Sequence, residues 1–313
     1  MDSVLADLRR EKIQSVLGTV REDGYRKIPD IGMNYVRWLV DSKLGNEEYI
    51  MRNILGNHMI LNINRKGISK SLAVLGKRER QCIEILSEVL EEDMTVLDLG
   101  ANIGYYTLIF ASQLNKEGTV HAIEPHPHNF KLLSSNIKMN GFEDIVNCHQ
   151  LAVSDSTGTA SLREANRDNV HSIGSSSDEG IRVRTTTVPQ FISEHGSLDL
   201  IRMDIEGYEE KVLDSICENE PEQLPEILFE VHSNKYTDKF EKIIETMIDS
   251  GYKARYVTSK DENSRTFQRY GYSPTKIVYD DRNKRGIYEN IQDTDLIDLL
   301  DDTRDIYLTN DHL

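Results

Sequence analysis

The chain has 313 residues, of which 38% are hydrophobic and 29% are charged, and its formal net charge at pH 7 is −16. A chain of this size buries a full core, and one large domain with accessory elements fits it better than two equal domains. The acidity argues against a nucleic-acid substrate and against adhesion to an anionic membrane, because both require a basic surface. A source adapted to high salt would produce the same acidity.

The first residues, MDSVLADLRREK, mix charged and apolar side chains without a hydrophobic stretch, so we expect no signal peptide. No run approaches the 18 or so apolar residues of a transmembrane helix, and we expect a cytoplasmic protein without membrane insertion. The three cysteines, Cys82, Cys148 and Cys217, are isolated in the sequence. We expect them to pack in the core and not to form a zinc site or a disulfide framework.

Residues 1–76 are expected to form a mainly helical extension, or cap, in front of a core domain over residues 77–313. The elements predicted in this extension are helices over Asp2–Leu17 and Met33–Ser42, a strand over Met59–Ile63 and a polar loop over Gly67–Gly76. In that loop, Ser69 and Lys70 are candidates to face a ligand. A helix over Glu79–Leu90 then leads into the core domain.

Short apolar stretches alternate with amphipathic ones of about 10–15 residues in the core domain, which is typical of a parallel sheet with right-handed crossovers. The predicted strands are Thr95–Leu99, Thr119–Glu124, Ile145–Val153, Leu198–Asp204, Glu226–His232, Tyr252–Thr258 and Asp305–Thr309. We therefore expect an α/β fold, Rossmann-like, with a mostly parallel seven-stranded sheet flanked by helices. Residues 260–288 are expected to be mostly irregular.

The stretch Thr95–Thr107 reads TVLDLGANIGYYT and joins a buried strand to a helix through Gly100, Asn102 and Gly104. This pattern is typical of the first βα turn of a nucleotide-binding sheet. Glycine permits the tight turn and the approach of a ligand to the bare backbone. Asp98, at the carboxyl end of the strand, requires a partner, which a ligand amine or hydroxyl would supply.

The next predicted strand, TVHAIE, ends at Glu124. In this geometry an acid accepts both hydroxyls of a ribose, which predicts an adenosine with a free ribose. A dinucleotide turn reads G-x-G-x-x-G, and its second glycine lets the pyrophosphate touch the backbone. Asn102 occupies that position here, and the spacing is G-x-N-x-G. The loop therefore suits S-adenosylmethionine, with its sulfonium and amino-acid end, better than NAD.

Polar side chains lie at the carboxyl ends of two later strands: Asp204, with Glu206 just after it, and then Glu230 with His232. Carboxylates rarely stay inside a core unless they are used or paired. For Asp204 and Glu206 three roles are open: hydrogen bonding to acceptor hydroxyls, general base catalysis, or holding a divalent cation with Glu230. Alternatively, Glu206 lies in the first turn of the next helix and complements its dipole. His232 is a further candidate base, and we assign no metal site from the sequence.

Residues 154–184 interrupt the alternation of strands and helices. SDSTGTASL predicts a small hairpin, and residues 166–180 form a polar loop rich in Ser and Gly. Such a loop is either a linker or a lid over the site. His171 and Ser172 lie in its middle and are candidates to contact substrate, although a histidine in such a loop is most often only solvated.

Four segments in order resemble the FkbM-type methyltransferases: DLGANIGYYT from Asp98, IEPHPHN from Ile123, LAVSD from Leu151 and LDLIRMDIEGYEEKVL from Leu198. The resemblance covers about residues 77–256. It implies a class I Rossmann-like methyltransferase fold with S-adenosylmethionine as the methyl donor. Characterised members mostly methylate oxygen on sugars or natural products.

The resemblance also implies roles for individual residues. The methyl donor would be lined by Asp98, Gly100, Asn102, Gly104 and Thr107, its ribose would be held by Glu124, and Ala152 and Asp155 would lie near its adenine. Asp204, Glu206 and Gly207 match the K-x-D-x-E-G element of the family, in which Arg202 replaces the usual lysine.

Together these features predict an S-adenosylmethionine-dependent O-methyltransferase that acts on a hydroxyl, or a carboxylate, of a sugar, glycan, lipid-linked sugar or related small metabolite. An alcohol acceptor requires a base such as Asp204, Glu206 or His232, whereas a carboxylate acceptor requires none. Two alternatives are an NAD-dependent oxidoreductase and a catalytically inactive binding subunit that keeps the fold. An RNA methyltransferase is disfavoured by the charge.

Overall fold

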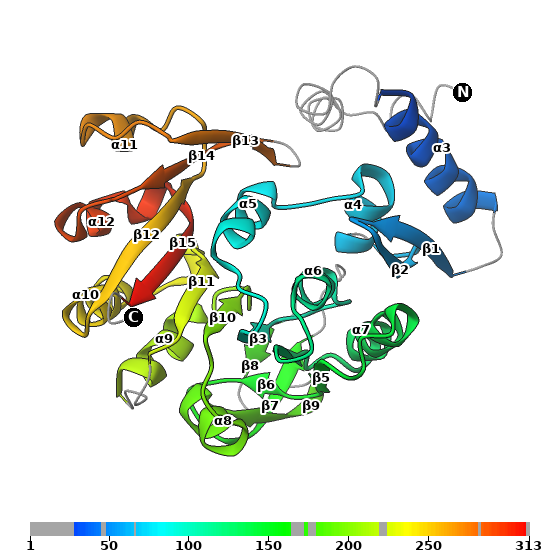
Figure 1. The fold of residues 1–313 in the computed structure, drawn as a ribbon, viewed down its shortest axis with the longest axis horizontal. Helices are drawn as coiled ribbons and strands as arrows, with labels where there is room; N and C mark the ends of the chain where they lie inside the picture. Colours follow the sequence, from blue (N-terminus) through cyan, green and yellow to red (C-terminus); the bar gives the residue numbers. More distant parts are fainter. Residues whose placement is uncertain are drawn as a thin grey trace.

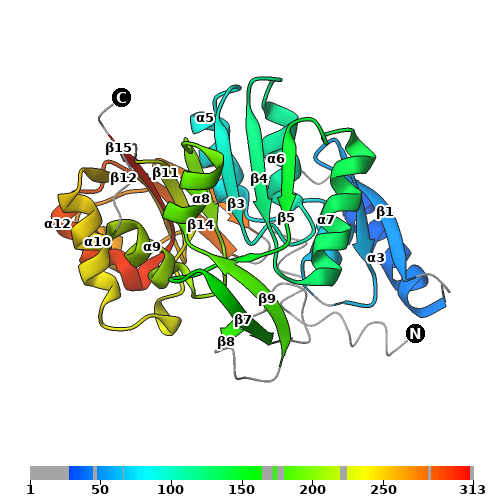
Figure 2. The same cartoon turned by 90° about the horizontal axis from the view of Figure 1, so that it is seen from below.

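The computed structural model describes residues 28–44, 48–65, 67–163, 172–174, 180–218, 224–280 and 283–310. These residues form a nine-stranded central sheet, a four-stranded sheet and a two-stranded hairpin (Figures 1 and 2). The hairpin and the C-terminal strands lie at opposite ends of the molecule (Figure 1).

The central sheet has the strand order β13-β14-β12-β15-β11-β10-β3-β4-β5. Its strands are β3 (Thr95–Leu99), β4 (Thr119–Ile123), β5 (Val146–His149), β10 (Leu200–Met203), β11 (Glu226–Glu230), β12 (Tyr252–Ser259), β13 (Lys276–Asp280), β14 (Asn283–Glu289) and β15 (Thr303–Asn310). The five strands from β11 to β5 pair in parallel, and β15 runs antiparallel between β11 and β12. The predicted α/β, Rossmann-like sheet is confirmed.

Two strands exceed the predicted seven. β13 and β14 form an antiparallel hairpin at one edge, within a segment that was expected to be irregular. Buried Val278, Ile287 and Tyr288 hold this hairpin to the core, but a run of charged and polar residues separates them in the sequence and hides the alternation. The predicted strand Ile145–Val153 is also divided, since β5 ends at His149 and Ala152–Val153 (β6) belongs to the small sheet.

Alternate residues of each central strand face different helices. Val96 and Val120 pack on the side of α5 (Arg80–Val89), α6 (Tyr105–Gln113) and α7 (Pro127–Asn140). Leu97 and Ile123 pack on the side of α8 (Val188–His195), α9 (Glu209–Glu218), α10 (Phe240–Asp249) and α12 (Asp293–Leu299). The sheet is therefore buried on both faces, as expected for parallel strands linked by helices.

The remaining elements are short. They are the 3₁₀ helices η2 (Ser233–Lys235) and η3 (Leu300–Asp302) and the helix α11 (Arg265–Arg269). The small sheet has the order β6-β9-β7-β8, with β7 (Gly158–Arg163), β8 (Ser172–Gly174) and β9 (Ile181–Thr186). Strand β9 leads directly into α8 (Figure 2).

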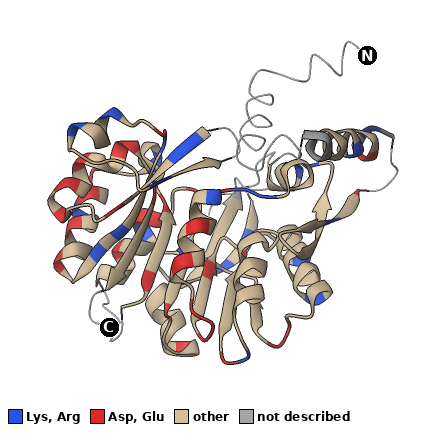
Figure 3. Cartoon of the chain, turned by 45° about the horizontal axis from the view of Figure 1, so that its top comes forward, with Lys and Arg blue, Asp and Glu red and all other residues tan. Residues whose placement is uncertain are grey.

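Acidic side chains are frequent on the helices of the C-terminal part (Figure 3). Within the described residues, no helix combines the length and apolar character that a membrane span requires.

The N-terminal elements are α3 (Ile28–Leu44), β1 (Tyr49–Ile54), β2 (Asn57–Asn62) and α4 (Ile68–Leu75). The predicted helix Met33–Ser42 lies within α3, and the predicted helix Asp2–Leu17 lies outside the described residues. The loop predicted over Gly67–Gly76 is wrong, because the segment forms α4 with Ile68 and Leu72 buried. Ser69 is also buried, and the Lys70 ammonium lies 4.0 Å from the centre of the Trp38 ring.

Two asparagines of α7 join the β1–β2 hairpin to the core. Asn136 Oδ1 accepts from the backbone N–H of Ile60 at 2.7 Å, and its Nδ2 donates to the carbonyl of Ile103 at 2.8 Å. Asn140, one helical turn further on, accepts from the N–H of His58 and donates to its carbonyl. The amides thus take the place of a neighbouring strand along this edge of β2.

Asn136→Ala is expected to lower the free energy of unfolding by about 2 kcal/mol, because it leaves buried backbone groups without partners. Denaturation in urea measures this effect. Ser135→Ala, a half-buried position of the same helix whose hydroxyl donates to the Lys131 carbonyl, is the matched control and is expected to stay within about 0.5 kcal/mol of the unmodified chain. Equal stabilities of the two variants would contradict the role assigned to Asn136.

Candidate functional site

The turn between β3 and α6 is built from left-handed residues. Gly100, Asn102 and Gly104 have φ of 79°, 52° and 93°, a region that favours glycine and asparagine. A Cβ on Gly100 would lie 2.3 Å from the carbonyl oxygen of Asp204, and one on Gly104 would lie 2.9 Å from Cδ1 of Leu133. At Gly100, therefore, the backbone that follows β10 makes the close approach that the sequence pattern assigned to a ligand.

Asp98 is fully buried at the end of β3. Its Oδ2 accepts a hydrogen bond of 2.6 Å from the Thr107 hydroxyl, and its Oδ1 lies 3.6 Å from Nη1 of Arg202. Burial raises the pKa of Asp98, while Arg202 and Thr107 act in the opposite direction. Oδ2 therefore has a hydrogen-bond donor within the chain, whereas Oδ1 has no hydrogen-bond partner among the described residues.

Glu124 joins the end of β4 to the glycine turn. Its Oε2 accepts from the backbone N–H of Asn102 at 2.9 Å, and its Oε1 accepts from that of His126 at 2.8 Å. The residue is only 4% exposed, and burial raises the pKa of its carboxyl to about 7, although these two hydrogen bonds and one from the Asn129 side chain act in the opposite direction. Each carboxylate oxygen has a second lone pair, so the group retains acceptor capacity for a ligand.

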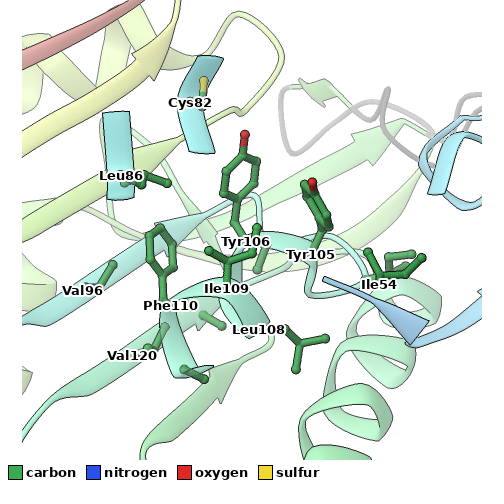
Figure 4. Packing of buried hydrophobic residues seen from close by; sticks show 14 of the residues in the cluster. Ile54, Cys82, Leu86, Val96, Tyr105, Tyr106, Leu108, Ile109, Phe110 and Val120 are labelled. Atoms are coloured by element: carbon green, nitrogen blue, oxygen red, sulfur yellow. The ribbon is translucent and has the colours of Figure 1, made fainter. Parts of the chain in front are cut away.

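Arg202 is the centre of a buried group of charges. It pairs in register with Asp98 on the neighbouring strand, and its Nη2 lies 3.2 Å from Oδ2 of Asp204 and 3.6 Å from Oε2 of Glu79. Its guanidinium also lies 4.0 Å from the centre of the Tyr106 ring, which α6 places between the sheet and α5 (Figure 4). Burial alone would lower the pKa of Arg202, but the surrounding carboxylates raise it, so the guanidinium stays charged.

Glu79 completes this group from the start of α5. Its Oε2 accepts from the hydroxyl of Tyr106 and its Oε1 from Nη2 of Arg78, each at 2.9 Å. Burial opposes ionisation, but Arg78 and Arg202 outweigh it and lower the pKa of Glu79 to about 2. Sequence reasoning did not find this position, because the surrounding KRER run is typical of a solvated face.

A second group of charges surrounds His232, just after β11. Its Nε2 lies 3.2 Å from Oε1 of Glu230 and 3.8 Å from Oε2 of Glu206, and its Nδ1 lies 3.4 Å from Oε1 of Glu209. Burial alone would lower the pKa of His232, but the carboxylates, Glu209 first, raise it. Burial raises the pKa of Glu230, which also pairs with Arg304.

Glu206 departs from both sequence interpretations. Its φ is 58°, so the backbone does not remain extended after Asp204 and the two side chains do not share one side of a strand. The first turn of α9 instead contains Glu209 and Glu210. Glu206 forms an ion pair of 2.6 Å with Lys235, whose Nζ also donates to the Glu206 carbonyl. Burial raises the pKa of Glu206, and neighbouring Asp204 adds to this effect.

Asp204, Glu230 and His232 are arranged as a metal centre would be. Each offers one ligand atom, and these atoms all lie within 4.8 Å of one another. Two carboxylates and an imidazole suit a divalent cation. The same carboxylates already face Arg202 and Arg304, so the structure leaves both a cation and a proton-accepting role open for them.

The other predicted residues lie in or next to the small sheet. Ala152 is buried in β6, and Asp155 is half exposed, with its Oδ2 3.4 Å from Nζ of Lys211. Ser172 is the first residue of β8, opposite Arg163 of β7, and His171 lies outside the described residues. Sequence reasoning missed Glu209 and Arg304, and it missed the central place of Arg202, although a charged residue inside the apolar run LDLIRMD was a visible signal.

The model of the Methyltransferase FkbM domain matches residues 98–254, half of the chain. The chain belongs to the FkbM methyltransferase family. The predicted family and its methyltransferase class are therefore confirmed, as is S-adenosylmethionine as the cofactor of the fold. The nicotinamide-dependent alternative finds no support in this match.

The hexuronic acid methyltransferase AglP of Haloferax volcanii is 26% identical over 160 residues, which are 50% of this chain and 63% of that protein. The chain therefore spans less than two thirds of this relative. A solved structure of methyltransferase FkbM from Methylobacillus flagellatus is 14% identical, with a TM-score of 0.41 and coverage of 84% of this chain and 59% of that one. TYW2 of M. jannaschii, solved in complex with AdoMet, is 16% identical, with a TM-score of 0.44 and coverage of 85% and 88%.

Proposed function

We propose that the chain is a cytoplasmic S-adenosylmethionine-dependent O-methyltransferase acting on a hydroxyl, or a carboxylate, of a sugar, a glycan or a related small metabolite. The main support is the meeting of two groups at neighbouring strand ends: the glycine turn with Glu124, and the cluster of Asp204, Glu230 and His232. Membership of the family and the name of the Haloferax relative favour a sugar acid as acceptor. A hexuronic acid carries both hydroxyls and a carboxyl, so an ether and an ester are both possible products.

The residues around the glycine turn fit the methyl donor. Asp98 Oδ1 is buried and lacks a hydrogen-bond donor among the described residues, which suits the ammonium of an amino-acid end. Glu124 accepts hydrogen bonds from the backbone of Asn102 and His126 and from the Asn129 side chain, and it keeps acceptor capacity for a ribose hydroxyl. Asn102 and the two glycines hold the backbone of the turn in place, and Ala152 with Asp155 is proposed to border the adenine. When bound, the donor supplies an electrophilic methyl group on sulfur.

On the acceptor side, the proton of an alcohol must leave as the methyl group arrives. His232, Asp204 and Glu206 are the proposed acceptors for it, and Glu230 holds the His232 ring at 3.2 Å. Alignment of acceptor oxygen, methyl and sulfur accounts for much of the rate in such a displacement, so fixed side chains are an advantage. His171 and Ser172 remain proposed substrate contacts. The net charge of −16 favours a small acceptor over a nucleic acid.

Thermal shift with S-adenosylhomocysteine and with NAD tests donor choice. We expect stabilisation by S-adenosylhomocysteine and none by NAD, and stabilisation by NAD alone would overturn the proposal. Isotope-labelled donor incubated with a cell extract then tests catalysis, followed by identification of the product. Donor binding without any labelled product would favour an inactive binding subunit.

Donor affinity is expected to depend on pH through Glu124. Its pKa is about 7, and ribose hydroxyls bind the ionised form, so the Kd should increase as the pH falls below 7, by up to about tenfold per unit. Titration with S-adenosylhomocysteine between about pH 5.5 and pH 8.5 measures this. Glu124→Gln should weaken binding by about 10–100-fold and remove the pH dependence. A pH-independent Kd for the unmodified chain would contradict the assignment.

A further inference from the structure

The outward face of α3 combines apolar and basic side chains. The exposed residues that the structure describes on this helix include no acid, and they are Gly32, Met33, Val36, Arg37, Val40 and Lys43. At about 100° per residue, the five side chains of this set fall within about a third of the helix circumference. Met33, Val36 and Val40 are 48–56% exposed.

The other side of α3 attaches the helix to the rest of the molecule. Tyr35 and Trp38 pack against Val74 of α4. Asp41 forms an ion pair of 2.9 Å with Arg52 of β1, so its charge is already compensated. The outward face is therefore not the face that holds α3 in place.

Exposed apolar side chains are concentrated in this part of the chain. Eight large hydrophobic residues are exposed among the described residues, and six of them belong to α3 and the β1–β2 hairpin: Met33, Val36, Val40, Tyr49, Met51 and Leu55. Single exposed apolar side chains are normal, whereas such a concentration marks an interaction surface.

The charge of the chain is divided unevenly. Residues 28–80 contain nine Lys and Arg against five Asp and Glu, whereas residues 81–313 contain 22 against 43. The acidity that argues against membrane adhesion therefore belongs to the core domain. The acidic C-terminal helices and α3 lie at opposite ends of the molecule (Figures 1 and 3). Because exposed charges are screened beyond about 8 Å at physiological ionic strength, the local charge of α3 decides what approaches it.

We propose that the outward face of α3 docks on the surface of an anionic lipid bilayer. Arg37 and Lys43 contact the lipid phosphates. Met33, Val36 and Val40 enter the boundary between the headgroups and the acyl chains. A helix with one apolar and basic face lies in the plane of a membrane surface in this way. The docking is independent of the proposed methyl transfer.

A second copy of the chain fits this face less well. A two-fold dimer through α3 places the cations of one face against a face that also carries only cations, and like charges across an interface are unfavourable. Three apolar side chains are also few compared with the roughly 20–30 residues that each partner contributes to a stable interface.

The docking is expected to be reversible and to need both kinds of side chain. Three half-exposed side chains offer less apolar surface than one myristoyl chain, which alone gives marginal binding of about 10⁴ M⁻¹. Each Lys or Arg near an anionic surface strengthens binding by about fivefold. Loss of either contribution should therefore be visible as a weaker affinity for vesicles.

Sedimentation of the full chain with lipid vesicles tests the proposal. We expect binding to vesicles of phosphatidylglycerol and phosphatidylcholine in equal amounts, and binding at least about tenfold weaker to phosphatidylcholine alone. Val36→Asp should weaken binding to the anionic vesicles by about tenfold or more. Ile277→Asp is the matched control, because Ile277 is 45% exposed on β13, at one edge of the central sheet. It should stay within about twofold of the unmodified chain.

Arg37→Glu tests the electrostatic part without changing an apolar side chain. It should weaken binding by about tenfold at low salt and by less at high salt, while its Tm stays that of the unmodified chain. An unmodified chain that does not sediment with anionic vesicles overturns the proposal, as does a Val36→Asp variant that binds as well as Ile277→Asp. A smaller mass of Val36→Asp in solution, without vesicle binding by the unmodified chain, would assign the face to a second copy and also overturn it.

Discussion

The double variant Asp204→Asn, Glu206→Gln is expected to reduce methyl transfer to an alcohol acceptor by about 10³-fold, because a positioned proton acceptor contributes about 10²–10⁴. The Kd for S-adenosylhomocysteine is expected to change by less than about threefold, since Asp204 approaches Gly100 through its backbone carbonyl, which the substitutions leave in place. Labelled-donor turnover and calorimetric titration measure the two quantities. Loss of donor binding would show that these carboxylates are misassigned.

The single variants are expected to differ. Glu206 is engaged by Lys235 at 2.6 Å, whereas Asp204 offers a ligand atom to the cluster with Glu230 and His232. We therefore expect Asp204→Asn to account for most of the loss and Glu206→Gln for less than about tenfold. Equal losses in the two variants would contradict this ranking.

A chelator separates the two roles open to the cluster. If Asp204, Glu230 and His232 hold a catalytic cation, stripping the unmodified chain abolishes turnover and added Mg²⁺ or Mn²⁺ restores it. If they accept a proton directly, stripping leaves turnover unchanged and His232→Ala is partly rescued by added imidazole. The Kd for S-adenosylhomocysteine is measured in the same samples and is expected to stay constant in both cases.

The sequence pattern placed the strand-end residues well, because an apolar run that stops at a charged side chain marks the point where a buried strand reaches the edge of the sheet. It predicted Asp98, Glu124, Asp204 and Glu230 at strand ends, and the structure has them there. It did not predict the side-chain partners, because these depend on sheet order and register. Glu79 and Arg202 are far apart in the chain, and they meet because the fold brings the start of α5 beside β10.

The sequence pattern also did not predict the local backbone conformation. The extended geometry assumed for Asp204 and Glu206 fails at one residue, whose φ of 58° turns the chain toward α9. The requirement for glycine at position 100 was predicted, but its cause was not, because no sequence pattern places the Asp204 carbonyl 2.3 Å from a hypothetical Cβ. Tertiary contacts across the sheet decide both cases.

Arg202→Met is expected to lower the free energy of unfolding at pH 7 by about 3–5 kcal/mol, the range for breaking a buried ion pair from one side. The change leaves Asp98 and Glu79 buried without the guanidinium that now lies 3.6 Å from each. Urea denaturation is the appropriate measurement, since guanidinium chloride would screen the charges. Arg255→Met, on an exposed position of β12, is the matched control and should cost less than about 0.5 kcal/mol.

The pH dependence of this loss has a definite sign. Burial already raises the pKa of Asp98, and removal of Arg202 raises it further. A group whose pKa is higher in the folded than in the unfolded state destabilises the fold as the pH increases through the folded value. The deficit of Arg202→Met should therefore be smaller at pH 5 than at pH 8. Arg202→Lys keeps one charge but loses the planar fork that reaches three carboxylates, and it should recover only part of the stability. An Arg202→Met variant as stable as Arg255→Met would mean that the buried charges contribute nothing to folding.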